Sequence, residues 1–354
     1  MDVYSFFTGA GFLDLGFEDS GFTIVFANEV HEPFFAGYEH SRSILDISLP
    51  DKCEVSSIKE VAKSRLLKKG RDSLVGFIGG PPCPDFSIAG KQKGASGSKG
   101  ALSKTYVDMI IREKPDWFLF ENVKGLWRTK KHRAFYDELC KTLIKSGYCL
   151  TNRLINALEY GVPQERERII LLGFKKTIAQ EKAGWINEKF PWEARQVFQM
   201  EDILEMPWPG QSTFGSTPQR PRDCSQQLMV ETWFNTNRVQ THPNATHCFK
   251  PRAGLARFQS VNEGDDSKKS YKRLHRWRYS PTAAYGNNEV HLHPYEARRI
   301  SVAEALAIQS MPEQFEFPAE MTLTNMFKTI GNGVPYLASK GLASSIRDYI
   351  ESKV

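Results

Sequence analysis

The chain has 354 residues, which is long enough for two domains with a sizeable core. Its hydrophobic share of 40% and charged share of 25% are ordinary for a globular protein, and no apolar stretch approaches membrane-spanning length. Six cysteines without a paired spacing favour a reducing, cytoplasmic setting without a secretory signal, and a net charge of +6 is too mild to identify a partner.

Residues 1–185 alternate strand-like and helix-like segments. Strands are expected at 3–7, 22–27, 74–79, 117–123, 153–157 and 169–174, with a further short run at 43–45. Helices are expected at 59–69, 106–113 and 132–146. This alternation predicts an α/β fold with a largely parallel sheet and helices on both faces, in which ligands bind beyond the carboxyl ends of the strands.

A glycine-rich turn follows the first strand-like run, in the segment FFTGAGFLDLGFE at 6–18. Gly9 and Gly11 let the backbone approach a ligand closely. Glu29 lies twenty residues after Gly9, the distance at which an acid reaches ribose hydroxyls in nucleotide-binding folds. The spacing is not GxGxxG, which favours a smaller nucleoside over a dinucleotide, and Asp46 and Ile47 are candidates for contact with its adenine.

Cys83 follows the strand pattern at 74–79 and lies among Pro81, Pro82 and Pro84. Each proline fixes φ near about −65° and restricts the residue before it, so the thiol is carried on stiff backbone. The glycine- and lysine-rich segment 89–100 comes next, which suggests a nucleophile beside a lid that closes over an anionic substrate. An inert, buried cysteine at a turn explains the same pattern about equally well.

An acid and two arginines are further candidates for chemistry. Glu121 ends an apolar strand, where poor solvation should raise its pKa toward that of a usable proton donor; a solvated acid or a helix cap is the plainer alternative. Arg166 and Arg168 enter the sixth strand on one face, a pattern that suits a phosphate or a carbonyl oxygen. A structural salt-bridge ladder would explain one of them.

From about residue 185 to 294 neither periodicity persists, so we expect a separate irregular domain of short strands and loops. Nine Lys/Arg and three acids give the window 250–278 a charge of +6, as expected of a nucleic-acid-facing patch or of a basic solvated loop. The histidines and Cys248 lack a closed ligand spacing, so no metal site is expected. Ser301 and Glu304 predict a capped helix, and a tight turn at 331–335 precedes a final helix at 336–352.

Six motifs, taken together and in their order, resemble those of the DNA (cytosine-5)-methyltransferase family. They are FFTGAGFLDLGFE, GGPPCPDFSIAGKQKG, FENV, YGVPQERERIILLG, RRISVAEALAIQSMPEQFEF and IGNGVP. The resemblance implies a Rossmann-like catalytic domain with a mainly parallel sheet, S-adenosyl-L-methionine (AdoMet) as methyl donor, and a smaller irregular target-recognition domain across a DNA cleft. We therefore expect a catalytic domain at 1–185, a recognition domain at 186–294, a helical connection at 295–322 and a returning C-terminal segment at 323–354.

The resemblance also implies roles for single residues. Cys83 would attack C6 of a flipped-out cytosine, Glu121 would hydrogen-bond or protonate N3, and Arg168 would hold O2. Arg166 and Asn122 would support this pocket. The cofactor contacts carried over are Phe7, Gly9, Gly11, Glu29, Asp46, Ile47 and Asn332. The expected DNA contacts are Ser87, Lys91, Lys93, Lys272, Arg273 and Thr282.

Three residues depart from the family pattern without removing a catalytic group. Pro84 stands where glutamine is usual, Phe12 where glycine is usual, and Ala283 where a larger aliphatic residue follows the threonine. Pro84 bears on how the flipped base is replaced in the stack, and Phe12 bears on the fit of the cofactor turn.

The leading interpretation is a monomeric enzyme that methylates double-stranded DNA. It is of the prokaryotic restriction–modification type, either paired with a cognate endonuclease that is a separate protein or a solitary relative. A tRNA cytosine methyltransferase on the same scaffold is the first alternative, although those relatives lack a large recognition domain and carry a Cys-Phe-Thr signature that this chain lacks. A non-catalytic DNA-binding relative is the second alternative. Retention of Cys83, Glu121 and Arg168 argues against it.

Overall fold

The computed structural model describes residues 1–68, 73–82, 100–251, 254–268, 270–283, 285 and 290–353. Eight strands form one sheet in the order β3-β2-β1-β4-β5-β7-β6-β8. They are β1 (Asp2–Phe6), β2 (Thr23–Glu29), β3 (Lys52–Val55), β4 (Val75–Gly79), β5 (Trp117–Val123), β6 (Tyr148–Asn156), β7 (Glu167–Lys175) and β8 (Gly184–Trp185). Among these strands β7 alone runs antiparallel to its neighbours, so the predicted mainly parallel sheet is confirmed.

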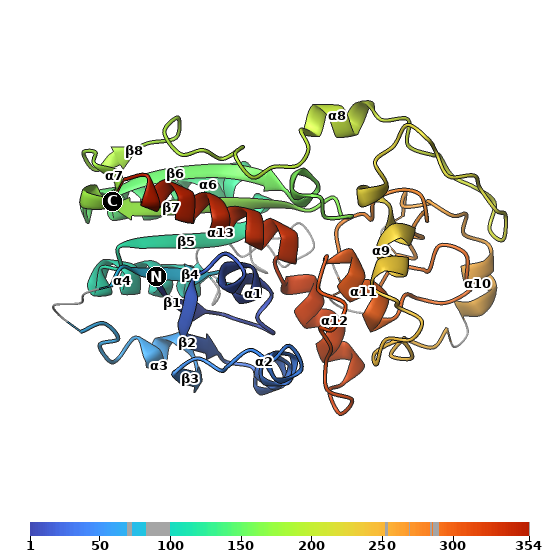
Figure 1. The fold of residues 1–354 in the computed structure, drawn as a ribbon, viewed down its shortest axis with the longest axis horizontal. Coiled ribbons are helices and arrows are strands. Elements are labelled where there is room, and N and C mark those ends of the chain that lie inside the picture. Colours follow the sequence, from blue (N-terminus) through green and yellow to red (C-terminus); the bar gives the residue numbers. More distant parts are fainter. Residues whose placement is uncertain are drawn as a thin grey trace.

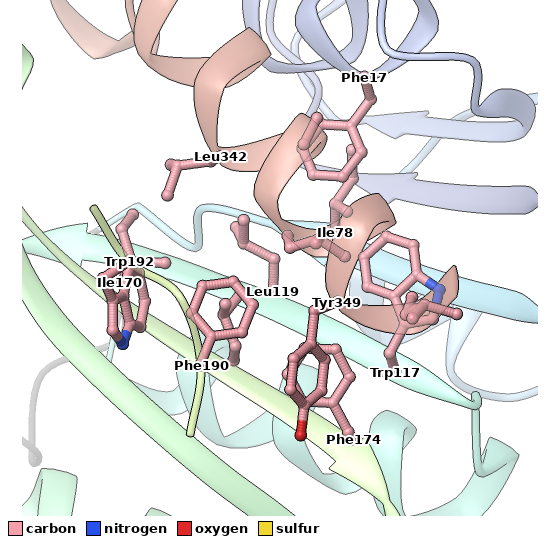
Figure 2. Close-up of a cluster of buried hydrophobic side chains, with 14 of the residues drawn as sticks. Phe17, Ile78, Trp117, Leu119, Ile170, Phe174, Phe190, Trp192, Leu342 and Tyr349 are labelled. Carbon is pink, nitrogen blue, oxygen red and sulfur yellow. The ribbon is translucent and has the colours of Figure 1, made fainter. Parts of the chain in front are cut away.

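Helices cover both faces of this sheet. The helices before residue 186 are α1 (Phe12–Glu18), α2 (Glu32–Ile44), α3 (Ile58–Val61), α4 (Gly100–Glu113), α5 (Lys124–Arg128), α6 (Lys130–Lys145), the 3-10 helix η2 (Ala157–Tyr160) and α7 (Lys176–Ala179). Alternation along β5 directs Trp117 and Leu119 to a core shared with α1 and the last helix, α13 (Tyr336–Glu351) (Figure 2). Phe118 and Phe120 point to the opposite core, which is shared with α3, α4 and α6.

Two expected elements are placed differently. The run at 43–45, expected to be the third strand, is the end of α2, and the third strand is β3, which pairs with β2. Both runs are short, so strand pairing rather than local pattern decides between them. A helix was expected at 59–69, but α3 ends at Val61. Only its single helical turn is anchored, by the buried Ile58 and Val61, and the chain leaves the helix at Ala62.

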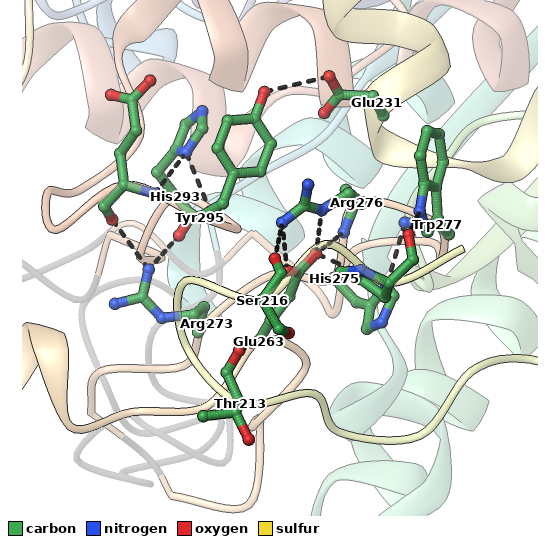
Figure 3. A network of polar contacts seen from close by, with 12 residues as sticks. Thr213, Ser216, Glu231, Glu263, Arg273, His275, Arg276, Trp277, His293 and Tyr295 are labelled. Atoms are coloured by element: carbon green, nitrogen blue, oxygen red, sulfur yellow. Dashed lines mark hydrogen bonds and ion pairs between the residues drawn. The ribbon is translucent and has the colours of Figure 1, made fainter. Parts of the chain in front are cut away.

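The region 186–294 is irregular, as predicted, but it contains short helices and single bridges where short strands were expected. Its helices are α8 (Met200–Glu205), the 3-10 helix η3 (Gln226–Leu228), α9 (Val230–Thr236) and α10 (Leu255–Gln259). Backbone groups in its described part are paired by side chains. Arg273 donates to four carbonyl oxygens, and the Glu263 carboxylate accepts from the backbone amide and the guanidinium of Arg276, as part of the network in Figure 3.

The chain then returns to the sheet through three helices, α11 (Val302–Ile308), α12 (Leu323–Asn332) and α13. The predicted capping box at the start of α11 is present: Ser301 Oγ accepts from the Glu304 amide, and the Glu304 carboxylate accepts from the Ser301 amide. Helix α13 packs against α1, so the last helix lies beside the first (Figure 1). No helix within the described ranges is long and apolar enough to cross a membrane.

Candidate active site

Glu121 and Arg168 meet at the edge of the sheet where the parallel strands end. Glu121 lies near the end of β5, and the antiparallel β7 begins at the same edge, with Arg168 opposite Val123 in the register. Arg168 Nε lies 2.9 Å from Glu121 Oε1, and the two side chains are 14% and 10% exposed. Burial raises the pKa of Glu121, while the two nearby arginines oppose that rise. The carboxyl group is therefore poorly solvated and held in a fixed orientation.

The segment that leads to Cys83 passes directly against this carboxylate. A Cβ atom on Gly80 would lie 2.7 Å from Glu121 Oε2, so only glycine permits this approach. Asn122 Nδ2 donates to the Pro81 carbonyl oxygen at 3.2 Å, while its Oδ1 accepts from the Val123 amide at 2.9 Å. Asn122 thereby fixes the backbone two residues before Cys83. The predicted residues Cys83, Pro84, Ser87, Lys91 and Lys93 lie outside the described residues.

Arg166 lies immediately before β7 and has different partners from Arg168. Its guanidinium is almost fully buried and donates to the carbonyl oxygens of Ala283 at 3.2 Å, Gly331 at 2.8 Å and Gly333 at 2.9 Å. These carbonyls belong to two segments that are more than a hundred residues away in sequence. Arg166 is therefore a positioning residue that joins the segment after Thr282 and the turn after α12 to the start of β7.

Thr282 is held beside the same strand. Its hydroxyl donates to the Glu165 carbonyl oxygen at 2.6 Å, and its side chain is exposed. The backbones of Ser280 and Pro163 pair at 2.8 Å, and the Ala283 amide donates to Gln164 Oε1 at 2.9 Å. The expected DNA contact Thr282 is thus fixed at the active-site edge by the chain that carries Arg166.

The expected DNA contact by Arg273 is not supported by the burial of its side chain. The Arg273 guanidinium is buried and lies over the Phe214 ring at 4.3 Å. It donates to the carbonyl oxygens of Phe258, Val261, Glu296 and His293, the last of which is labelled in Figure 3. Burial keeps it from a phosphate, because four of its five N–H groups already donate to the backbone. Lys272, its neighbour, remains partly exposed.

The glycine turn after β1 and the end of β2 form a second cluster at this edge. The Gly9 amide donates to Glu29 Oε2 at 3.0 Å, and Glu29 Oε1 accepts from the amides of Val30 and His31. Phe7, Gly9 and Gly11 adopt φ of 58°, 57° and 82°. Glu29 Oε2, which accepts from one amide only, keeps acceptor capacity for a hydroxyl. Thr8 Oγ1 is buried without a partner among the described residues, so this turn suits a nucleoside ligand.

The remaining expected cofactor contacts are less closely gathered. Asp46 is exposed just after α2 with φ 55°, and Ile47 packs partly against the core beneath α11 and α12. Asn332 is the exposed last residue of α12, between the two carbonyls that Arg166 holds. The Phe12 ring is buried against Phe315, in the space left by the missing side chain of Gly333.

Several supporting residues were not singled out from the sequence. Asp14 is fully buried and accepts hydrogen bonds from Ser5 at 2.6 Å and Tyr38 at 3.1 Å. The Tyr38 ring also lies where a Cβ on Gly11 would be, at 2.7 Å, so it supports the glycine turn from below. Asp14 belongs to the first motif, but no local signal connects it to Tyr38. Within the described part of the chain, no group of three or more His, Cys, Asp or Glu residues is arranged to hold a metal ion.

Comparison with known proteins agrees with this geometry. A sequence model of the C-5 cytosine-specific DNA methylases matches residues 1–348. The chain is 56% identical over 360 residues to the Type II methyltransferase M.NmeDI of Neisseria meningitidis serogroup C, an alignment that covers 99% of this chain and 84% of the relative. It is 29% identical to the Type II methyltransferase M.MthTI of Methanothermobacter thermautotrophicus, covering 99% of this chain and 98% of the relative.

A likeness to solved structures supports the fold. A protein described as a DNA modification methyltransferase encoded within a prophage of E. coli superposes with a TM-score of 0.67 at 21% identity, over 99% of both chains. The family match spans nearly the whole chain and includes both the segment with Cys83 and the paired Glu121 and Arg168. The chain therefore belongs to the C-5 cytosine-specific DNA methylase family and is a DNA (cytosine-5-)-methyltransferase.

Proposed function

We propose that this enzyme transfers a methyl group from AdoMet to C5 of one cytosine within a specific duplex sequence, through a covalent bond between Cys83 and C6. The observation that carries the proposal is the buried Glu121–Arg168 pair, with Gly80 against its carboxylate. That contact brings the segment leading to Cys83 to the pair at which a cytosine ring would be recognised. Stacked bases do not expose C6, so the target base must leave the duplex.

Each of these residues acts on a different atom of the cytosine ring. The Cys83 thiolate adds to C6 while Glu121 donates a hydrogen bond or a proton to N3, so that electron density builds at C5. Because burial raises the pKa of Glu121, a proton on this carboxyl is less costly than on an exposed one. Arg168 holds O2 of the base. When C5 has taken the methyl group, loss of the C5 proton returns electrons to the ring and expels the Cys83 thiolate.

AdoMet would supply an electrophilic methyl group on a sulfonium. We assign its ribose hydroxyls to Glu29 and its close backbone contacts to Phe7, Gly9 and Gly11, because this turn approaches a ligand without side chains between. Asp46, Ile47 and Asn332 complete the proposed set. Asp46 carries the least support, because the sheet position expected for it belongs to β3.

The proposed division of the chain follows from these assignments. Residues 1–185 and 323–354 form the catalytic domain, 186–294 the recognition domain and 295–322 the connection. The DNA contacts that we retain are Thr282, Lys272 and, on the segment that follows Cys83, Ser87, Lys91 and Lys93. The five described cysteines are unpaired, which suits a reducing cytoplasm. We further propose that the enzyme acts as a monomer and that any cognate endonuclease is a separate protein.

Bisulfite sequencing of DNA from cells that express the chain tests this function. We expect one short sequence motif to carry 5-methylcytosine, and Cys83→Ser to abolish the signal because a hydroxyl is too weakly acidic to add to C6. Purified Cys83→Ser should still bind AdoMet by calorimetry, which separates lost chemistry from lost folding. Methylation that persists in Cys83→Ser would exclude the nucleophile assignment, and 5-methylcytosine confined to tRNA would favour the alternative substrate.

A further inference from the structure

A short basic segment lies outside every role assigned so far. Residues 124–133, KGLWRTKKHR, contain five Lys/Arg, and no Asp or Glu occurs between Asn122 and Tyr136. This segment comprises α5 and the first turn of α6. A run of like charge is often only a solvated face, so its place in the fold and its partners decide what it can do.

The topology brings this basic segment to the active-site edge. It begins immediately after β5, whose end carries Glu121, and α6 then runs back toward the start of β6 at the opposite edge. Helix α4 packs against α6 and begins at Gly100, where the chain returns from the segment that carries Cys83. The basic segment therefore flanks the same edge as the paired Glu121 and Arg168.

The positive charge of this segment is only partly neutralised. Lys124 and Arg128 share one carboxylate, that of Glu167, with Arg128 at 3.5 Å and 58% exposed. Arg133 pairs with Asp137 at 2.9 Å. Lys130 is exposed and makes no ion pair with any residue that the structure describes. The four cations whose side chains the structure describes have two acidic partners, which leaves a net charge of +2 beside the site.

Some basic residues of the recognition domain are buried and cannot contact DNA, which makes the basic segment 124–133 a stronger candidate for a DNA contact. Two of the nine Lys/Arg in the window 250–278 are not available to DNA: Arg273 serves the backbone, and Arg276 forms an ion pair with the buried Glu263 at 2.8 Å. The net charge available on the recognition side is therefore smaller than the sequence suggests. Each further phosphate that the enzyme neutralises adds affinity for the duplex, which offsets the energy of displacing one base.

We propose that the surface formed by Lys124, Arg128, Lys130 and Arg133 binds the phosphate backbone of the DNA duplex beside the target cytosine. The proposal rests on the proposed function, and it adds a contact surface on the catalytic domain to the one on the recognition domain. Contacts to phosphates fix the register and orientation of a duplex but carry no sequence information directly, so this surface contributes affinity and orientation without reading sequence. The salt dependence of DNA binding therefore reports whether this surface contacts phosphates.

The experiment compares two double variants on one helical segment. Arg128→Gln with Lys130→Gln removes two exposed cations at the active-site edge, while Lys141→Gln with Lys145→Gln removes two exposed cations from α6 at its opposite end. We measure the binding constant of each full-length protein over a salt series. One duplex contains the sequence that the enzyme methylates, and the other is unrelated. We expect the first variant to bind both duplexes more weakly and to lower the slope of log K against log salt by about 2. The second variant should retain the wild-type slope.

The outcomes separate this surface from the enzyme's function. If the wild type methylates DNA and both variants keep its slope, the surface is refuted and the proposed function stands. If the wild type neither binds nor methylates duplex DNA, both fall together. Lys130→Gln alone removes no ion pair to a described residue, so it provides a folded variant whose slope should fall by about 1.

Discussion

Asp14 is a buried carboxyl group whose charge opposes folding. It accepts hydrogen bonds from Ser5 and Tyr38 beneath the glycine turn, and Glu18 and Arg42 pair with each other at 2.5 Å close by. Burial raises the pKa of Asp14 to about 7; the neighbouring Glu18 adds to this, while the hydrogen bonds and Arg42 oppose it. The folded protein therefore keeps a proton on Asp14 at pH values where the unfolded chain has released it.

The proton on Asp14 makes the free energy of unfolding depend on pH. Between pH 4 and pH 7 the folded state binds more protons at Asp14 than the unfolded state does, so the free energy of unfolding should fall as pH rises through this window. Asp14→Asn lacks this titration. Its stability relative to the wild type should therefore rise across the same window by about 4 kcal/mol. Urea unfolding at several pH values measures the difference, and parallel wild-type and Asp14→Asn profiles would contradict it.

At the level of elements, the start of β7 is where three distant segments are joined. The buried Arg166 side chain donates to the carbonyl oxygen of Ala283 and to those of Gly331 and Gly333. A planar guanidinium has several N–H donors in fixed directions and can therefore reach all three. A lysine ammonium at this position can reach only part of the set and leaves buried carbonyl oxygens unpaired. Arg166 therefore couples the recognition segment to the catalytic strand through fixed hydrogen bonds.

Arg166→Lys should destabilise the protein by about 2–4 kcal/mol because of these unpaired carbonyls. It should also raise KM for DNA more than it lowers kcat, since Thr282 loses its fixed position while Glu121 and Arg168 keep theirs. Arg153→Lys is the matched control, because Arg153 is a partly exposed arginine on β6 that pairs with Glu193 at 3.1 Å and with Glu159 at 3.6 Å, and lysine keeps the charge that both pairs need. That variant should change stability by less than about 1 kcal/mol. Equal effects of the two substitutions would exclude the positioning role.

The same elements show how far local sequence could lead. The apolar run that ends in Glu121 predicted β5 with its bounds, since both strand and carboxylate are local features. Period two predicted that Arg166 and Arg168 share a face, but their partners depend on the register of β5 with β7 and on segments over a hundred residues away. Charge alone suggested a DNA contact at Arg273, whereas the side chain is buried and donates to backbone carbonyls that are distant in sequence. Pairing with β2 likewise selected β3.

Across the whole molecule, the first and last helices close one face of the sheet together. The core between them contains Phe17 of α1, Trp117 and Phe174 of the sheet, and Leu342 of α13 (Figure 2). Leu342 is 1% exposed, so its truncation leaves a cavity between segments from both ends of the chain. Because α1 follows the glycine turn directly, a loss of packing at α13 is transmitted to the cofactor side of the site.

Leu342→Ala should therefore lower the free energy of unfolding by about 2–5 kcal/mol. Leu204→Ala removes the same atoms from a side chain that is 68% exposed, and it should change stability by no more than about 0.5 kcal/mol. Urea unfolding followed by tryptophan fluorescence compares the two, and AdoMet binding should weaken only in Leu342→Ala. If Leu342→Ala unfolds at the same urea concentration as Leu204→Ala, the two ends of the chain do not share a core in solution.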